Sequence, residues 1–138
     1  MAAFNLQMID LQSIGSIVLT PHPSVCLLVS DAISPAMDFK GLVRTLIPAG
    51  CQYFMILGHA AEDVHDALDD AIDDCDLGYC GTPTAVHNDE SAEEIASFLL
   101  NAAIPGEANV RCLVGYDNEY NPVREIVQKL RVEYLKSK

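Results

Sequence analysis

The sequence predicts a single α/β domain over residues 1–138, with a four- to five-stranded, mostly parallel sheet between two layers of helices. Two observations lead to this fold class. Short apolar runs of strand length alternate along the chain with segments whose apolar residues recur at helical spacing. Half of the residues are hydrophobic, which is enough for a buried core. The expected outline is therefore Rossmann-like or flavodoxin-like.

Four apolar runs are expected to form the core strands: 25–30, 51–58, 83–87 and 110–116. Segment 1–24 is expected to hold an edge strand or an irregular N-terminal stretch, and the β-branched residues at 16–20 make SIVLT the candidate strand. The side chains expected in the core are Val25, Leu27, Val29, Phe54, Ile56, Val86, Leu113 and Val114.

Four helices are predicted, and their expected starts are Ser34-Pro35, Ala61, Ser91 and Asn121-Pro122. Ser34 as N-cap with Pro35 at the first helical position is typical of a helix start. Pro48 and Gly50 are expected to end the first helix. The second helix has a regular apolar stripe formed by Val64, Ala67, Leu68, Ala71, Ile72 and Cys75. The third helix opens with a capping-box pattern of Ser91 and Glu94.

Charge is distributed very unevenly along the chain. The formal net charge is −12, which argues against binding to DNA, RNA or an anionic membrane surface. Between Arg44 and Arg111 there is no lysine or arginine, whereas that stretch holds 13 acidic residues. No apolar run approaches the roughly 20 residues that a membrane-spanning helix needs. The sequence therefore predicts an acidic protein whose last helix is mildly basic.

The cysteine usage predicts a reducing, cytoplasmic location. The chain has five cysteines, an odd number without the spacing of a disulfide framework: Cys26, Cys51, Cys75, Cys80 and Cys112. The N-terminal stretch also lacks the basic residues that precede the apolar part of a secretory signal. Cys75 lies among Asp73, Asp74 and Asp76, and these carboxylates disfavour a reactive thiolate.

The strongest anomaly is the polar side of the second helix. It holds seven acidic residues: Glu62, Asp63, Asp66, Asp69, Asp70, Asp73 and Asp74. Several pairs lie three or four residues apart, and each such pair costs a few tenths of a kcal/mol through repulsion. We therefore expect this helix, with Asp89 and Glu90 of a later turn, to bind a basic protein partner, as an immunity protein or antitoxin does. A solvated face that favours solubility is the competing interpretation.

Polar residues at the predicted strand ends suggest an alternative, a metal site or a small enzyme that uses His59, His87, Asp89 and Asp117. Ordinary helix caps and loop residues explain the same pattern, and no metal-ligand spacing motif is present. The first strand-to-helix turn has no glycine-rich phosphate loop, so no nucleotide or other cofactor is expected. A homodimerising domain without a ligand is the third interpretation. The sequence favours a binding domain over an enzyme.

Two stretches resemble a family of small bacterial α/β domains of unknown function. They are AGCQYFMILGHAAEDVHDALDDAI and VHNDESAEEIASFLLNAA, and the resemblance extends over most of the chain from about Val25 onward. The resemblance implies the α/β fold, and it implies no enzymatic or binding activity. The positions that match the family pattern are His59, His65, Asp66, His87, Asp89 and Glu90, and the resemblance implies no catalytic role for any of them.

Overall fold

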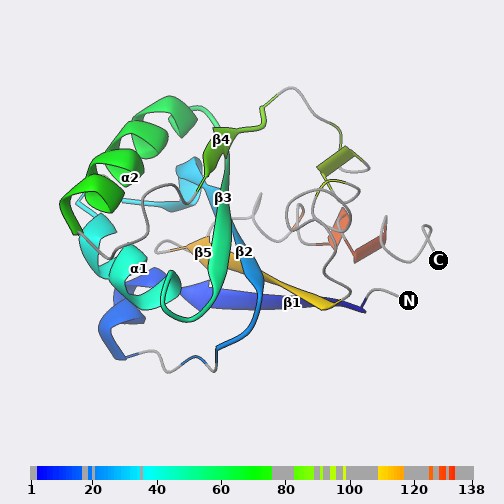
Figure 1. Ribbon diagram of the computed structural model, residues 1–138. Coiled ribbons are helices and arrows are strands. Elements are labelled where there is room, and N and C mark those ends of the chain that lie inside the picture. Colours follow the sequence, from blue (N-terminus) through cyan, green and yellow to red (C-terminus); the bar gives the residue numbers. More distant parts are fainter. Residues whose placement is uncertain are drawn as a thin grey trace.

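The computed structural model describes residues 3–16, 19, 21–34, 36–75, 83–88 and 109–116, together with Ser91, Glu94, Ile95, Phe98, Glu125, Gln128, Lys129, Arg131 and Val132 (Figure 1). Five strands form one sheet: β1 (Ala3–Asp10), β2 (Ser24–Val29), β3 (Cys51–Leu57), β4 (Thr84–Val86) and β5 (Asn109–Tyr116). Their order is β1-β5-β2-β3-β4, and all neighbouring strands are parallel. The predicted α/β fold with a parallel sheet is confirmed.

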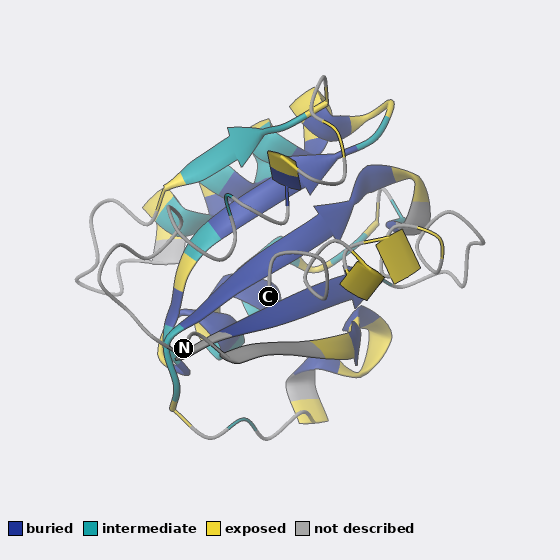
Figure 2. Ribbon diagram, turned by 90° about the vertical axis from the view of Figure 1, so that its right-hand side faces the viewer, coloured by how far each residue is buried: buried dark blue, intermediate teal, exposed yellow. Residues whose placement is uncertain are grey.

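The sheet is covered on both faces. All six residues of β2 are buried, which requires packing on each side of this central strand. Cys26 and Leu28 join the cluster that includes the inner faces of α1 (Phe39–Leu46) and α2 (Ala61–Cys75). Val25 and Leu27 point to the opposite face, because successive side chains of a strand alternate. The helical residues among 94–98 and 125–132 lie across the sheet from α1 and α2 (Figures 1 and 2).

The strand order reverses next to β2. The chain continues from β2 to β3 and β4 on one side, whereas β5 and β1 lie on the other side. In open α/β sheets, the crevice for a ligand forms at the carboxyl ends of the strands where such a reversal occurs. Here the reversal lies between the neighbouring strands β2 and β5.

The N-terminal strand lies earlier in the chain than predicted. Within 16–20, Ser16 ends the 3-10 helix η1 (Leu11–Ser16) and Leu19 is not in a strand, so the prediction is wrong for these two residues. Residues 17, 18 and 20 lie outside the described part of the chain. The strand is β1, which pairs with β5 from Ala3 opposite Asn109 to Asp10 opposite Tyr116. Apolar and polar residues alternate through FNLQM at the centre of β1, a period-two pattern that favours a strand.

The first helix begins later than predicted. Ser34 does not cap it, because its hydroxyl oxygen accepts a hydrogen bond from the Ala36 N–H at 3.2 Å in a local turn. The N-cap is Asp38, whose carboxylate accepts the Gly41 N–H at 2.9 Å, and α1 starts at Phe39. Both residue types favour turns and caps, so the sequence alone did not distinguish them. The predicted helix end is confirmed, since the Gly50 N–H donates to the Ile47 carbonyl at 3.0 Å.

The other elements follow the predictions closely. The helix expected to start at Ala61 is α2, and Val64, Leu68 and Ala71 of its stripe are buried. Ser91 accepts the Glu94 N–H at 3.1 Å, as the capping pattern predicts. Seven of the eight expected core residues are buried: Val25, Leu27, Val29, Phe54, Ile56, Leu113 and Val114. The eighth, Val86, is half-buried and packs against the core.

Among the helices of the described residues, none is long and apolar enough to span a membrane.

For the last predicted helix, five described positions are helical and exposed: Glu125, Gln128, Lys129, Arg131 and Val132. Four of these residues are polar or charged, and Val132 is an exposed hydrophobic residue. The expected start of this helix at Asn121-Pro122 lies outside the described residues.

Candidate functional site

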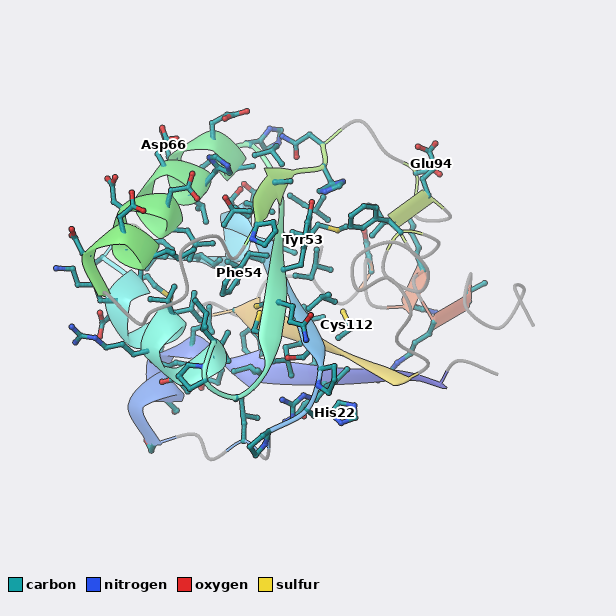
Figure 3. The ribbon with its side chains drawn as sticks, viewed as in Figure 1. His22, Tyr53, Phe54, Asp66, Glu94 and Cys112 are labelled. Carbon is teal, nitrogen blue, oxygen red and sulfur yellow. The ribbon has the colours of Figure 1, made fainter. Side chains whose placement is uncertain are left out.

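The outward side of α2 carries a dense group of carboxylates. Six acidic side chains of this helix are exposed, and we call them the acidic face: Glu62, Asp63, Asp66, Asp70, Asp73 and Asp74. They lie opposite the buried stripe that packs α2 against the sheet and α1. Figure 3 shows Asp66 and neighbouring carboxylates projecting away from the sheet. The arrangement follows from the helical period, which separates the apolar positions from the acidic ones.

Asp69, the seventh predicted acidic residue of α2, has a different environment. It is half-buried, and one of its oxygens accepts a hydrogen bond from the Thr84 hydroxyl of β4 at 2.5 Å. Its other oxygen lies 3.6 Å from Nε2 of His65. Asp69 therefore joins α2 to the edge strand β4 and is less available to a partner. Its position next to Leu68, at the border of the apolar stripe, is the sequence signal for this role.

Among the described residues, few positively charged side chains lie near the acidic face to offset its charge. Lys40 Nζ lies 3.6 Å from Asp74, but both side chains are more than half exposed. Exposed pairs of this kind contribute about 0–1 kcal/mol. His65 Nδ1 lies 3.5 Å from Asp66, and the last turn of α2 contains no basic residue. The carboxylates at this end also meet the negative end of the helix dipole, which adds an unfavourable contribution.

The strand-end histidines have separate environments. His59 is exposed in the turn after β3. His87 Nε2 lies 3.0 Å from the Tyr53 hydroxyl, and its ring centroid is 5.0 Å from that of Phe98. No group of three His, Cys, Asp or Glu side chains that could hold a metal occurs among the described residues. Asp89, Glu90 and Asp117 lie outside the described residues.

Other polar residues at the strand ends connect neighbouring strands. The Ser30 hydroxyl oxygen accepts the Ala60 N–H at 3.1 Å, which joins the end of β2 to the start of α2. The Asn88 side chain accepts the Gly58 N–H at 2.8 Å and donates to the Gly58 carbonyl at 3.1 Å. These contacts support the interpretation of strand-end polar residues as structural groups. Sequence reasoning missed the pairs because they depend on strand order.

Three cysteines are buried in the sheet. The free thiols among the described residues are Cys26, Cys51 and Cys112, at most 3% exposed. Burial raises the pKa of Cys51 and of Cys112 to about 12. For Cys51, hydrogen bonds with the backbone of Tyr53 and Cys26 and the charge of Arg111 oppose this rise of the pKa only in part. Thiols in this state are protonated at neutral pH and poor nucleophiles.

These buried thiols predict a loss of stability at alkaline pH. In the unfolded chain a cysteine ionises near its ordinary pKa of 9.0, whereas Cys51 and Cys112 stay protonated in the folded protein up to about 12. Their contribution to stability is therefore complete below pH 9 and is lost as pH rises toward 12. The expected slope is about 1.4 kcal/mol per pH unit for each thiol. Urea unfolding from pH 8 to 11 measures this dependence of the unfolding free energy on pH. The Cys112→Ala variant is expected to have a smaller slope than the wild type. An unchanged slope would contradict the raised pKa of Cys112 as a cause of the alkaline loss of stability.

The chain belongs to a family described as a domain of unknown function (DUF7684), which matches residues 6–131. This confirms the resemblance to a family of unknown function that the sequence indicated. No curated protein matches the chain. No activity is assigned to this family.

Proposed function

We propose that this protein is a binding domain that engages a basic protein partner through the acidic face of α2, in the manner of an immunity protein or an antitoxin. The observation that carries the proposal is the exposure of six carboxylates along one side of a single helix. Such a row attracts a positively charged surface and accelerates its association. It also repels nucleic acids and anionic membranes, which leaves a basic protein as the complementary partner.

The energetic cost of the acidic face supports a role beyond packing. Glu62–Asp66, Asp66–Asp70 and Asp70–Asp74 are pairs of like charge four residues apart on α2. Each costs about 0.2–0.5 kcal/mol, and the charges at the C-terminal end add to this cost. A partner that supplies positive charge would convert this repulsion into attraction. A site for metal ions is less well supported, because these carboxylates follow one helix and do not surround a point.

The same cost leads to a prediction for the isolated protein. The double variant Asp66→Lys/Asp73→Lys is expected to raise the free energy of unfolding by about 1 kcal/mol at low salt, because repulsive pairs become attractive. The gain should shrink in 1 M NaCl, since salt screens exposed charges. Urea unfolding at both salt concentrations measures this difference. Unchanged or reduced stability at low salt would show that the carboxylates do not repel one another appreciably.

Binding is tested by affinity capture with the tagged protein from a lysate of the native host, at low and at high salt. The expected result is recovery of a basic protein at low salt that Asp66→Lys/Asp73→Lys no longer recovers. With the purified partner, this variant should bind with an association rate at least about tenfold lower. Because the variant is expected to be more stable than the wild type, a loss of binding cannot be attributed to unfolding.

A matched control separates the acidic face from net charge. Asp31 and Glu125 are exposed and lie outside α2, so Asp31→Lys/Glu125→Lys changes net charge by the same amount. This control should retain the partner with nearly unchanged salt dependence. If the wild type, the α2 variant and the control recover the same proteins, or none, the proposal is wrong and the acidic face serves solubility.

A further inference from the structure

The edge strand β1 carries an unprotected row of backbone groups. It has eight residues and pairs with β5 along its whole length, with a continuous register. A strand at the edge of a sheet turns a row of N–H and C=O groups outward, and such a row can pair with another strand. Within the described part of the chain, no second strand lies along the outer side of β1 (Figure 1).

The sequence of β1 lacks the features that usually keep an edge from pairing. Natural edges are blunted by lysine, proline, β-bulges or a short length. The strand contains no lysine and no proline, and its register against β5 has no shift. The opposite edge of the sheet is different, because β4 has three residues and its Thr84 is hydrogen-bonded to Asp69 of α2. Edge-to-edge pairing is therefore favoured at β1 and disfavoured at β4.

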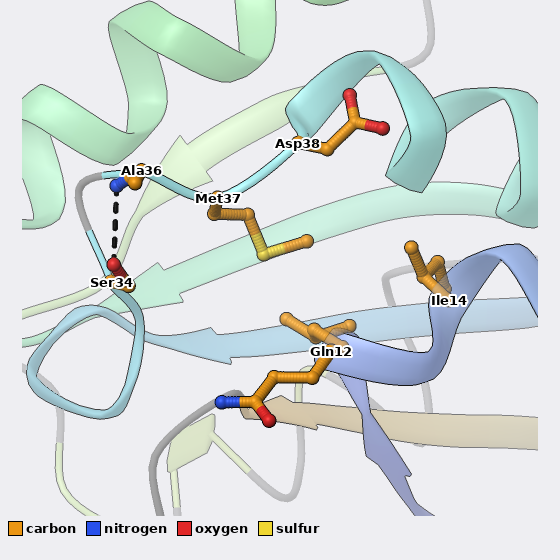
Figure 4. A pocket seen from close by; sticks show the side chains of 7 residues that line it. Gln12, Ile14, Ser34, Ala36, Met37 and Asp38 are labelled. Carbon is orange, nitrogen blue, oxygen red and sulfur yellow. Dashed lines mark hydrogen bonds between the residues drawn. The ribbon is translucent and has the colours of Figure 1, made fainter.

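The helix that follows β1 packs inward. Leu11 and Ile14 of η1 are buried in the core cluster that includes α1. Figure 4 shows Met37, from the connection before α1, extending toward Ile14. Met8 of β1, in contrast, is 39% exposed and lies on the sheet face opposite the buried Ile9. The edge therefore combines backbone hydrogen-bonding groups with an exposed apolar side chain.

The charge distribution favours a second copy of the chain at this edge. Two copies with a formal net charge of −12 each repel one another wherever their acidic surfaces meet. Asp10 is the only Asp, Glu, Lys or Arg among the first 30 residues, so the edge carries little charge. The acidic face lies on α2, which is joined to β4 at the other side of the sheet. Pairing through β1 therefore keeps the two acidic faces roughly 30 Å apart, several Debye lengths at physiological salt.

We propose that two copies of this chain pair through their β1 edges and form one continuous sheet with five strands from each copy. A twofold axis normal to the sheet makes the two β1 strands antiparallel and closes the assembly at two copies. The two Asp10 carboxylates then lie at opposite ends of the paired strands, and both Met8 side chains lie on the same face of the shared sheet. This interface shares no residue with the acidic face, so the two proposals stand or fall separately.

The mass of the full chain in solution tests the pairing. Light scattering after size-exclusion chromatography should show a dimer at about 100 µM that dissociates on dilution to about 1 µM, as expected for a small interface. A monomer throughout this range, or an assembly that grows beyond two copies, would overturn the inference.

Hydrogen exchange at the same two concentrations locates the interface. The outward amides of β1 should exchange at least about tenfold more slowly in the dimer, because they gain hydrogen-bond partners. The amides of β5 should not change, since β5 lies between β1 and β2 in either state. Slower exchange confined to elements other than β1 would contradict the proposed interface.

Two variants make the test specific. Met8→Glu places like charges beside the shared edge and should raise the dissociation constant of the dimer at least about tenfold. Unchanged exchange of the β5 amides in this variant shows that β1 still pairs with β5. Val132→Glu is the matched control, because Val132 is also an exposed large hydrophobic residue and lies outside β1. A dimer that persists in Met8→Glu, or one that Val132→Glu dissociates, would overturn the inference.

Discussion

Replacing Gly50 with alanine is expected to lower the free energy of unfolding by about 3 kcal/mol or more. Gly50 has a φ of +107°, a conformation that costs a residue with a side chain about 1–3 kcal/mol. An added β-carbon would also overlap the backbone carbonyl of His22. That backbone is held in place, because the His22 N–H donates to the Ala49 carbonyl at 3.0 Å and the Ser24 N–H to the Gly50 carbonyl at 3.1 Å. Urea unfolding of Gly50→Ala measures the loss.

A comparison with Gly58 tests this explanation. Gly58 also has a positive φ, +111°, but the nearest obstacle to its β-carbon is the side-chain oxygen of Ser30. The loss in Gly58→Ala should therefore be partly relieved in a Ser30→Ala background. His22→Ala should not relieve Gly50→Ala, because the obstacle there is backbone. Relief by His22→Ala would contradict the proposed cause.

Replacing Phe54 with alanine is expected to cost about 3–5 kcal/mol. Phe54 lies in the middle of β3, is fully buried and belongs to the core cluster that includes α1 and α2. The substitution removes apolar contacts and leaves a cavity that rigid neighbouring elements cannot fill. Because small domains have net stabilities of about 5–15 kcal/mol, this is a large fraction of the total. Calorimetry or urea unfolding should show a lower midpoint.

The preceding residue of the same strand provides the control. Tyr53 points to the other face of the sheet, where its hydroxyl lies 3.0 Å from His87 Nε2. Tyr53→Phe keeps the ring and removes one hydrogen-bonding group, so the expected loss is about 0.5–1.5 kcal/mol. Losses of similar size at Phe54→Ala and Tyr53→Phe would contradict the assignment of Phe54 to the main core.

Periodic apolar patterns made much of this fold predictable. The buried runs of β2, β3 and β5 and the stripe of α2 are local signals, and their bounds agree with the structure to within one or two residues. The positions predicted for two elements, the N-terminal strand and the first helix, were wrong because two neighbouring stretches of sequence favour the same element there. Ser34 and Asp38 are both good caps, and SIVLT resembles a strand more strongly than the mixed residues of β1 do.

The candidate site was predictable only in part. The exposure of Asp66 and Asp70 follows from the helical period alone. The hydrogen bond between Asp69 and Thr84, and the pairing of Asn88 with Gly58, join segments that are distant in sequence. They depend on β3 and β4 being neighbours, which no local pattern specifies.

The pairing of β1 with β5 has a consequence for how the protein is made. Ala3 lies opposite Asn109, so the first strand acquires its partner only after about 100 further residues have been synthesised. At about 5–20 residues per second, a ribosome needs roughly 5–20 s for this length. During that interval β2 and β3 can pair with each other, whereas β1 has no neighbour to join. We expect β1 to be the last strand to enter the sheet on a translating ribosome, and therefore the segment most exposed to chaperones.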